Sequence, residues 1–498
     1  MKKAPLRPLV VASLLAACLI FLGSGVARAA ENDQLKMILQ RLDALEKENR
    51  TLKDTVRQLQ QKVSPGDETR SAADPLEEAV RNLPVAEQAR PRPEEARADL
   101  ASVDLGGRAK LRLIDISLDV LVAAGSSSER DEEIEVLQGG GHDPRRRGFT
   151  LQQAELSLIG AVDPYFLAEA HIIATEDTIE LEEAFARTMN LPWGLEVEGG
   201  FFFTEFGRIN PTHPHAWIWM DQPVINTRMF GGEGMRGAGV RVSKLLGTPW
   251  YSVLHVGAQN ADGEFMASFL GGEVGHGHGG DEDEDEEFGI GRRPIVSQDV
   301  RNLGDLVYLV RWENAFDLSS SWTAKVGLSG LYGPNFTGSD GETWVYGADF
   351  LCKWQPEGSF QGRPFFQLEG EFIKRDLRAD DAVDEDDEEI AGDTLHDWGF
   401  YLQALYGFPG RWAVGLRYEY ASGSGGSLTH DGEFEGRSDD PFRDDRWRIA
   451  PLLVFSPSEF SRLRLQYNID DADHLDEVAH SVWLGLEVLI GTHPAHSF

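Results

Sequence analysis

Alternation of apolar and polar residues is the feature that most restricts how this chain can fold. It runs from about residue 108 to the C-terminus in stretches of roughly ten residues, the length of a tilted strand that crosses a bilayer. A strand with an apolar outer face and a charged inner face fits a barrel with lipid outside and water inside. We therefore predict an all-β fold over residues 107–498, a transmembrane antiparallel β-barrel. One clear stretch alternates Trp412, Val414, Leu416, Tyr418 and Tyr420 with Arg411, Ala413, Gly415, Arg417 and Glu419.

The spacing of these stretches predicts about sixteen strands. Every second connection is short and contains Pro or Gly in most cases, as periplasmic turns do, while the connections between them are mostly longer and polar. An even number of strands also brings both ends of the barrel to the periplasmic side. Fourteen or eighteen strands stay open, because the fourth stretch alternates poorly. The expected strands are 108–123, 148–161, 165–174, 179–189, 194–204, 234–245, 250–261, 304–315, 321–333, 343–354, 363–375, 396–407, 411–422, 446–456, 461–469 and 478–491.

The N-terminus has the features of an export signal. Basic residues at the start precede the apolar segment Leu9 to Leu22, which is short for a transmembrane helix, and Ala27-Arg28-Ala29 is an A-x-A cleavage site. Residues 1–29 are therefore predicted to be a signal peptide. The alternative, lipoprotein cleavage before Cys18, is disfavoured by the apolar residues that follow the cysteine. The expected location is the outer membrane of a Gram-negative-type bacterium, with the N-terminal segment in the periplasm.

Residues 30–63 are predicted to form an α-helical coiled coil, and residues 64–106 a flexible linker. The polar core residue Asn49 would fix the helix register. Val at heptad position a with Leu at position d favours a dimeric coiled coil, whereas the interface between barrels favours a homotrimer. We expect a homotrimer that forms through the barrel and the coiled coil together. A single amphipathic helix packed on another periplasmic protein is the alternative. The heptad a positions are Leu35, Leu42, Asn49, Val56 and Val63, and the d positions are Ile38, Leu45, Leu52 and Leu59.

The net charge of −36 comes largely from acidic runs between the expected strands, where solvated loops would carry it. This charge disfavours nucleic-acid binding. The inward faces of the strands carry both signs of charge, so the lumen shows no one-sign ladder that would set ion selectivity. The expected lumen charges are Arg241, Arg311, Arg417, Arg448, Arg462, Arg464, Asp115, Asp119, Glu369 and Glu371.

The third outer connection, residues 205–233, is much richer in Trp, His and Pro than a solvated loop. These residues favour a loop that folds back into the barrel and narrows the pore, although packing over the barrel rim or against a neighbouring subunit is an equal alternative. Its two histidines could also bind a metal, but Asp221 alone makes a thin set of partner ligands. The expected constriction and solute-binding residues are Arg208, His213, His215, Trp217, Trp219, Asp221 and Arg228.

A second unusual connection, residues 271–288, combines glycine, histidine and a run of acidic residues. His276, His278, Asp281 and Glu282 are candidate ligands for zinc or a similar divalent ion. The glycines would prevent a preformed site, so binding would be weak. A solvated acidic loop without metal is the alternative, and no cofactor is expected beyond such a weakly bound ion.

With its signal peptide, coiled coil and sixteen-strand barrel, the chain resembles the phosphate-selective porin O/P type. The segment Arg147-Gly148-Phe149-Thr150-Leu151-Gln152-Gln153-Ala154-Glu155-Leu156 adds to the resemblance. The family implies trimers, a pore narrowed by the third loop, and lysine and arginine ladders for anions. This third loop has Arg208 and Arg228 but no lysine cluster. Residues 207–223 and the histidine-acidic connection also look like outer-membrane proteins labelled as zinc-regulated receptors, which implies a role in metal uptake.

These features predict a passive porin for small hydrophilic solutes or ions. Two alternatives are a barrel for divalent metal acquisition and a structural tether from the outer membrane to the cell wall. The predicted partners are outer-membrane lipid, the permeating solutes and, for a tether, the cell wall. No enzyme is expected, because the sequence has no Gly-x-Ser-x-Gly element, metalloprotease H-E-x-x-H motif or phosphate loop.

Overall fold

The computed structural model of the protein describes residues 102–104, 110–112, 114–176, 178–272, 289–359, 362–383, 389–428, 434–435 and 440–491. They belong to one compact unit, Glu94–Phe498. The predicted signal peptide, the coiled coil and nearly all of the linker lie outside the described residues. No helix in the described part of the chain is both long and apolar enough to cross a membrane.

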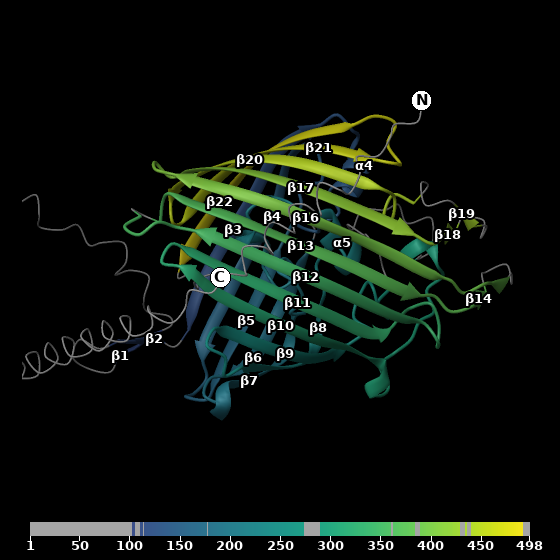
Figure 1. Cartoon of the computed structure of the whole chain (residues 1–498), viewed down its shortest axis with the longest axis horizontal. Helices are drawn as coiled ribbons and strands as arrows, with labels where there is room; N and C mark the ends of the chain where they lie inside the picture. Colours follow the sequence, from purple (N-terminus) through teal and green to yellow (C-terminus); the bar gives the residue numbers. More distant parts are fainter. Residues whose placement is uncertain are drawn as a thin grey trace, which may run out of the picture. The chain divides into compact units, whose positions relative to one another are not determined.

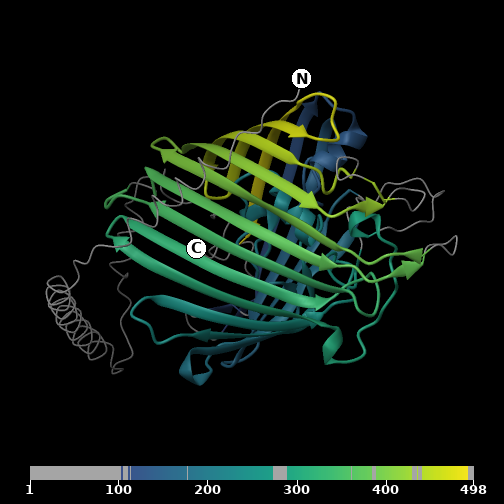
Figure 2. The ribbon, with the colours of Figure 1, turned by 45° about the vertical axis from the view of Figure 1, so that its right-hand side comes forward.

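Sixteen antiparallel strands close into one barrel, in which each strand pairs with its neighbours along the chain and β22 closes on β3 (Figure 1). The strands run tilted around the barrel (Figure 2). They are β3 (Asp115–Ser127), β4 (Gly148–Ala161), β5 (Phe166–Ala174), β6 (Ile179–Thr188), β7 (Leu195–Phe203), β8 (Arg236–Leu245), β9 (Tyr251–Asn260), β10 (Leu306–Ser319), β11 (Trp322–Pro334), β12 (Glu342–Trp354), β13 (Phe365–Arg378), β16 (Thr394–Phe408), β17 (Trp412–Ser424), β20 (Arg446–Ser458), β21 (Ser461–Ala472) and β22 (Ala479–Gly491).

The predicted fold class and strand number are confirmed. The largest difference is at the first strand, which was expected from residue 108 but begins at Asp115. Just before it, β2 (Lys110–Arg112) pairs with β1 (Ser102–Asp104) in a hairpin apart from the barrel sheet. Two further hairpins lie in long connections, β14 (Ala382–Val383) with β15 (Glu389–Ile390) and β18 (Ser427–Leu428) with β19 (Phe434–Glu435).

The outer face of the barrel is apolar and the inner face is polar. On β17, Val414 and Leu416 are exposed while the alternating Arg417 and Glu419 are buried. Aromatic residues gather near both strand ends: Trp322 lies opposite Trp354 at one end, and Tyr332 opposite Trp344 at the other. A closed barrel with an apolar outer belt between two aromatic girdles is the architecture of a membrane-spanning barrel.

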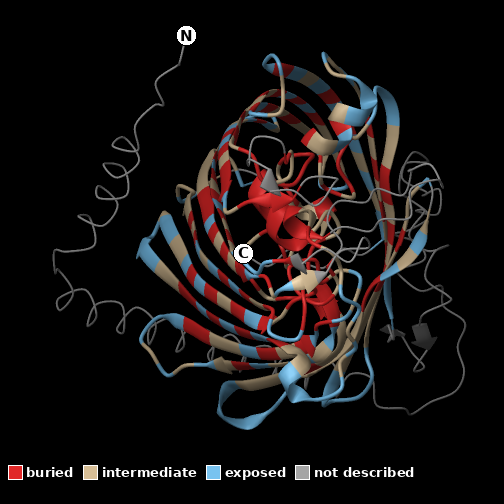
Figure 3. Cartoon of the chain, turned by 90° about the vertical axis from the view of Figure 1, so that its right-hand side faces the viewer, coloured by how far each residue is buried: buried red, intermediate tan, exposed pale blue. Residues whose placement is uncertain are grey.

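The barrel interior holds the third loop. It includes a short 3-10 turn, η3 (Pro214–Ala216), and helix α5 (Val224–Phe230), whose residues are nearly all buried. Viewed toward one end of the barrel, α5 and its neighbouring segments fill the middle of the ring of strands (Figure 3). The principal core cluster joins Phe206, Ile225 and Met229 of the loop to inward residues of the wall.

Two β-bulges break the alternation of the wall beside this loop. Between β5 and β6 the register shifts after His171, so that Glu182 is the extra residue on β6. Between β3 and β4 it shifts after Leu121, and Gln152 is the extra residue on β4. A bulge places two consecutive side chains on one face. The bulge at Glu182 explains why the fourth predicted strand alternates poorly.

Candidate functional site

The third loop is bonded to opposite sides of the barrel wall. His215 Nδ1 lies 2.6 Å from Glu155 Oε2 on β4, and the Arg208 amide donates to Glu371 Oε1 on β13 at 3.1 Å. Counting around the ring of sixteen strands, β4 and β13 are seven positions apart, one short of diametrically opposite. The loop therefore crosses the lumen instead of lining one side of it.

Asp221 is the most heavily bonded residue of this crossing. Its carboxylate forms ion pairs with Arg417 of β17 and with Arg448 of β20, the latter at 2.9 Å. It also accepts hydrogen bonds from Gln466 at 2.8 Å and Asn468 at 3.0 Å, both on β21. Burial raises the pKa of Asp221, but Arg417 and Arg448 outweigh burial and hold it below its usual value. Four wall residues on three strands thus fix one loop carboxylate.

The two loop arginines are also engaged. Arg208 lies 3.3 Å from Glu369 of β13, and Arg228 lies 2.7 Å from Asp444 of the connection before β20. Their charges are offset by these carboxylates. Neither arginine presents the unopposed positive charge that an anion-selective constriction uses.

The loop tryptophans are packed side chains. Trp219 is 1% exposed and donates from Nε1 to the Ala450 carbonyl at 2.9 Å, while Trp217 donates to the Thr212 carbonyl within the loop at 2.8 Å. Glycines on the inner wall make room for such side chains. A Cβ added at Gly415 would lie 3.0 Å from the Trp219 ring, and one at Gly485 would lie 2.7 Å from the end of Met220. Glycine in a strand allows another chain segment to approach closely.

A second group of contacts joins the loop to strands β4 to β6 of the wall, and we name it the histidine–glutamate cluster. His213 Nδ1 lies 2.7 Å from Glu182 Oε2, and His213 Nε2 lies 2.8 Å from Glu183 Oε2. Glu155 contacts His215 at 2.6 Å and His171 at 3.0 Å. The cluster consists of His213 and His215 of the loop, Glu155 of β4, His171 of β5, and Glu182 and Glu183 of β6.

Local strand geometry assembles this cluster. Glu155 and His171 lie at inward positions of neighbouring strands, where Ser157 pairs with His171 in the register of β4 and β5. The bulge on β6 turns both Glu182 and Glu183 inward, where a regular strand would turn only one. Burial lowers the pKa of His213, but Glu182 and Glu155 outweigh burial and raise it well above its ordinary value.

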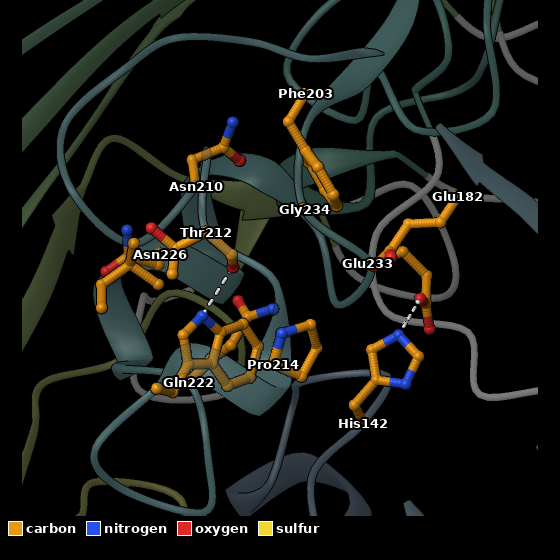
Figure 4. A pocket seen from close by; sticks show the side chains of 12 residues that line it. His142, Glu182, Phe203, Asn210, Thr212, Pro214, Gln222, Asn226, Glu233 and Gly234 are labelled. Carbon is orange, nitrogen blue, oxygen red and sulfur yellow. Dashed lines mark hydrogen bonds and ion pairs between the residues drawn. The ribbon is translucent and has the colours of Figure 1, made fainter. Parts of the chain in front are cut away.

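A small cavity borders the cluster (Figure 4). Its volume is about 10 Å³, room for about one water molecule, and its lining includes Glu182, Phe203 and Pro214. Across the cavity, His142 lies 3.1 Å from Glu233. Burial lowers the pKa of His142, but the Glu233 carboxylate outweighs burial and raises it to about 9, while His142 and Arg236 help to lower the pKa of Glu233 to about 2 against the effect of burial. This ion pair joins the first long connection to the end of the third loop.

The expected lumen charges lie at inward positions of their strands. Arg311 pairs with Asp349 at 2.6 Å, and Arg448 pairs with Asp470 at 2.7 Å. Arg464 lies 3.4 Å from Glu487, which also pairs with Arg462. The mixed charges of the wall therefore pair with one another, as the alternating sequence allows. Arg241 pairs with Glu198 and Glu205, Arg417 pairs with Glu419, and Glu369 pairs with Arg208 of the third loop. Glu371 accepts from the Arg208 amide, Asp119 is buried, and Asp115 is exposed at the start of β3.

Sequence reasoning found the loop residues of this site but missed most of the wall residues. From the sequence, Asp221 was the expected partner ligand of His213 and His215. In the structure, the two histidines contact Glu155, Glu182 and Glu183 instead. Asp221 pairs with arginines. The signal was present in the poor alternation of residues 179–189, which marks the bulge. The candidate ligands His276, His278, Asp281 and Glu282 lie outside the described residues.

No protein-family model matches this chain. At 28% identity over 417 residues, it is similar to an uncharacterized protein of Aquifex aeolicus, and the match covers 78% of this chain and 81% of that protein.

Among solved structures, the barrel resembles outer-membrane porins. The outer membrane channel DcaP of Acinetobacter baumannii has 12% identity and a TM-score of 0.47, with 76% of this chain and 97% of that chain covered. An anion-selective porin of Comamonas acidovorans has 10% identity and a TM-score of 0.42, with 76% and 98% covered. OprB of Pseudomonas putida has 12% identity and a TM-score of 0.41, with 76% and 94% covered. Membership of the phosphate-selective porin type stays a prediction.

Proposed function

We propose that this protein is an outer-membrane channel for the passive diffusion of small hydrophilic solutes or ions. The observation that carries the proposal is a closed membrane-type barrel with a polar, charged inner wall, whose lumen is crossed by the third loop. A wall of this composition stays hydrated, and a crossing segment restricts what passes. The process needs diffusion through a wet lumen and no chemical catalysis.

The crossing supports a narrow path and a weak preference between ions. The third loop is anchored to both sides of the wall, so only small species would pass around it. Wall arginines such as Arg311 and Arg448 are paired with carboxylates, and so are both arginines of the loop. Charges paired in this way do not impose one sign on the permeating ion. This arrangement supports a channel without strong phosphate preference.

A homotrimer in the outer membrane is the assembly we propose. Its support is the apolar outer belt, which fits lipid or a second barrel, while the heptad pattern of residues 35–63 supports self-association without fixing three copies. The mass of the detergent-solubilised full chain, corrected for bound detergent, distinguishes one, two and three copies. A mass of three copies is expected, and a mass of one or two copies would contradict this assembly.

Planar-bilayer conductance tests the channel. Purified full-length protein, shown to be folded by its heat-modifiable mobility on gels, is added to a bilayer between unequal salt solutions, and the reversal potential is recorded. We expect steady conductance with a small reversal potential that added phosphate changes little. Bilayers that stay closed in every salt, although folded protein has inserted, would contradict the proposal.

A further inference from the structure

The histidine–glutamate cluster holds an unusual charge balance. Glu155 and Glu182 are each 0% exposed, and Glu183 is buried beside them. Among the described residues, the groups that form ion pairs with these three carboxylates are histidines. Imidazoles that bind a metal are neutral, so in a metal-bound cluster the ion would supply the positive charge that these carboxylates need. Buried charges in proteins are paired or coordinate a metal ion.

Glu182 has an ion-pair partner in His213 but an unmet need for hydrogen bonds. Neither of its carboxylate oxygens accepts a hydrogen bond within the described part of the chain, although both are fully buried. It lies 2.7 Å from His213 Nδ1, but this contact lacks hydrogen-bond geometry. The side chain also lines the small cavity beside the loop (Figure 4). A buried carboxylate in this condition points to a bound water or ion that would complete its contacts.

The donor atoms converge closely enough to share an ion. Glu155, His213 and His215 each offer one ligand atom, and these atoms lie within 4.8 Å of one another. His171, Glu183 and His213 satisfy the same condition and form an overlapping set. A shared zinc ion would require either set to close to metal–ligand bond lengths of about 2.0–2.2 Å.

We propose that the histidine–glutamate cluster binds a divalent transition-metal ion of the zinc type. Imidazole nitrogen with carboxylate oxygen suits zinc, cobalt, nickel and copper, whereas magnesium and calcium favour oxygen-only sites. The site lies between the third loop and strands β4 to β6, so a bound ion would fasten the loop to this wall. Nothing in the proposal depends on whether the barrel conducts.

Zinc binding to the full-length protein tests the site. The protein is purified without a histidine tag, stripped with a chelator, and titrated with zinc chloride by calorimetry in the presence of excess magnesium. We expect at least one zinc equivalent that magnesium does not displace. The double variant His213→Gln/His215→Gln should lose that equivalent, with affinity reduced by more than about 100-fold, because loss of two ligands exceeds the 10- to 100-fold effect of an outer partner.

A matched variant separates this site from the histidine-acidic connection. His276→Gln/His278→Gln removes the two histidines of residues 271–288 and should leave the tight equivalent in place. Loss of the tight zinc in this variant alone would overturn the proposal, and so would a wild-type protein that binds no zinc.

A conservative substitution keeps the test valid if the double histidine variant fails to fold. Glu182→Gln preserves shape and removes one charge, and it should weaken zinc binding about 10-fold or more while the barrel keeps its heat-modifiable mobility. X-ray absorption of the zinc-loaded wild type should show nitrogen and oxygen neighbours at about 2.0–2.2 Å that include imidazole. Unchanged zinc affinity in Glu182→Gln together with an all-oxygen shell would contradict the site.

Discussion

At the scale of single residues, buried charges of the third loop pair with buried charges of the barrel wall. Asp221 receives two arginines and two amides from the wall, and the arginines have further carboxylates of their own. Removing one member of such a network leaves other charges buried and unpaired. The sequence showed which residues were polar and inward, but it could not show which charges pair, because pairing depends on where the loop enters the barrel.

Replacing Asp221 with alanine should therefore destabilise the barrel. We expect a loss of about 3–5 kcal/mol in the free energy of unfolding, the usual cost of breaking a buried ion pair from one side. Urea unfolding followed by tryptophan fluorescence measures it. Asp317→Ala, at an exposed position of β10, is the matched control and should change stability little. Equal stability of the two variants would contradict the role of Asp221 as an anchor.

The ion pair between His142 and Glu233 predicts a pH dependence. Because the pKa of His142 is raised to about 9 in the folded protein, its contribution is complete below its unfolded value near 6.5 and disappears as pH rises through 9. The lowered pKa of Glu233, about 2, adds stability above its unfolded value near 4.5, which is lost as pH falls through 2.

The difference in unfolding free energy between wild type and His142→Gln should thus be largest between about pH 5 and 6.5. We expect a difference of about 1–3 kcal/mol in that window, shrinking toward zero above pH 9. Unfolding series for both proteins across this range provide the measurement. A difference that grows above pH 9 would show that the pair is not formed as described.

At the scale of elements, glycines on the inner faces of the strands leave space for side chains of the third loop. Gly347 of β12, Gly399 of β16 and Gly415 of β17 lie where Phe206, Ile225 and Trp219 approach the wall. A glycine removes the side chain that would otherwise occupy that space. In the sequence, Gly415 takes an ordinary inward place in an alternating stretch, so its spatial relation to the loop was not visible there.

Filling one of these places should displace the loop. In Gly415→Leu the new side chain would occupy the position of the Trp219 ring, so we expect a loss of about 1–3 kcal/mol in stability and a shift in tryptophan fluorescence. Gly330→Leu is the matched control, because Gly330 lies on β11 with open space around its missing Cβ. A similar effect of both substitutions would mean that the inner wall does not hold the loop at Gly415.

The bulge at Glu182 gives a second prediction at this scale. Deleting Glu182 removes the extra residue and leaves the inward and outward faces of β6 in register with β5 and β7. Deleting Ser329 from the regular strand β11 instead turns part of that strand inside out. We expect the first variant to assemble into a heat-modifiable barrel and the second to fail. Equal assembly of both would contradict the assigned register.

At the scale of the whole molecule, the sequence predicted the barrel well because its lipid-facing side imposes a regular period. Strand number, connection pattern and inward charges all follow from that period. The arrangement of the third loop inside the barrel has a different cause. The third loop is placed by contacts between residues far apart in the chain, such as Asp221 with Arg448 and His213 with Glu183. Local patterns do not encode such contacts, so the histidine–glutamate cluster emerged only from the fold.

The most direct test of the central claim compares single-channel conductance with and without the loop crossing. Replacing residues 212–229 with a short glycine–serine linker removes the buried segment and leaves all sixteen strands intact. If the third loop narrows the lumen, the wild type should give a small, steady conductance and the variant a several-fold larger one in the same salt. Equal conductance of the two proteins, both shown to be folded and inserted, would contradict a channel restricted by the third loop.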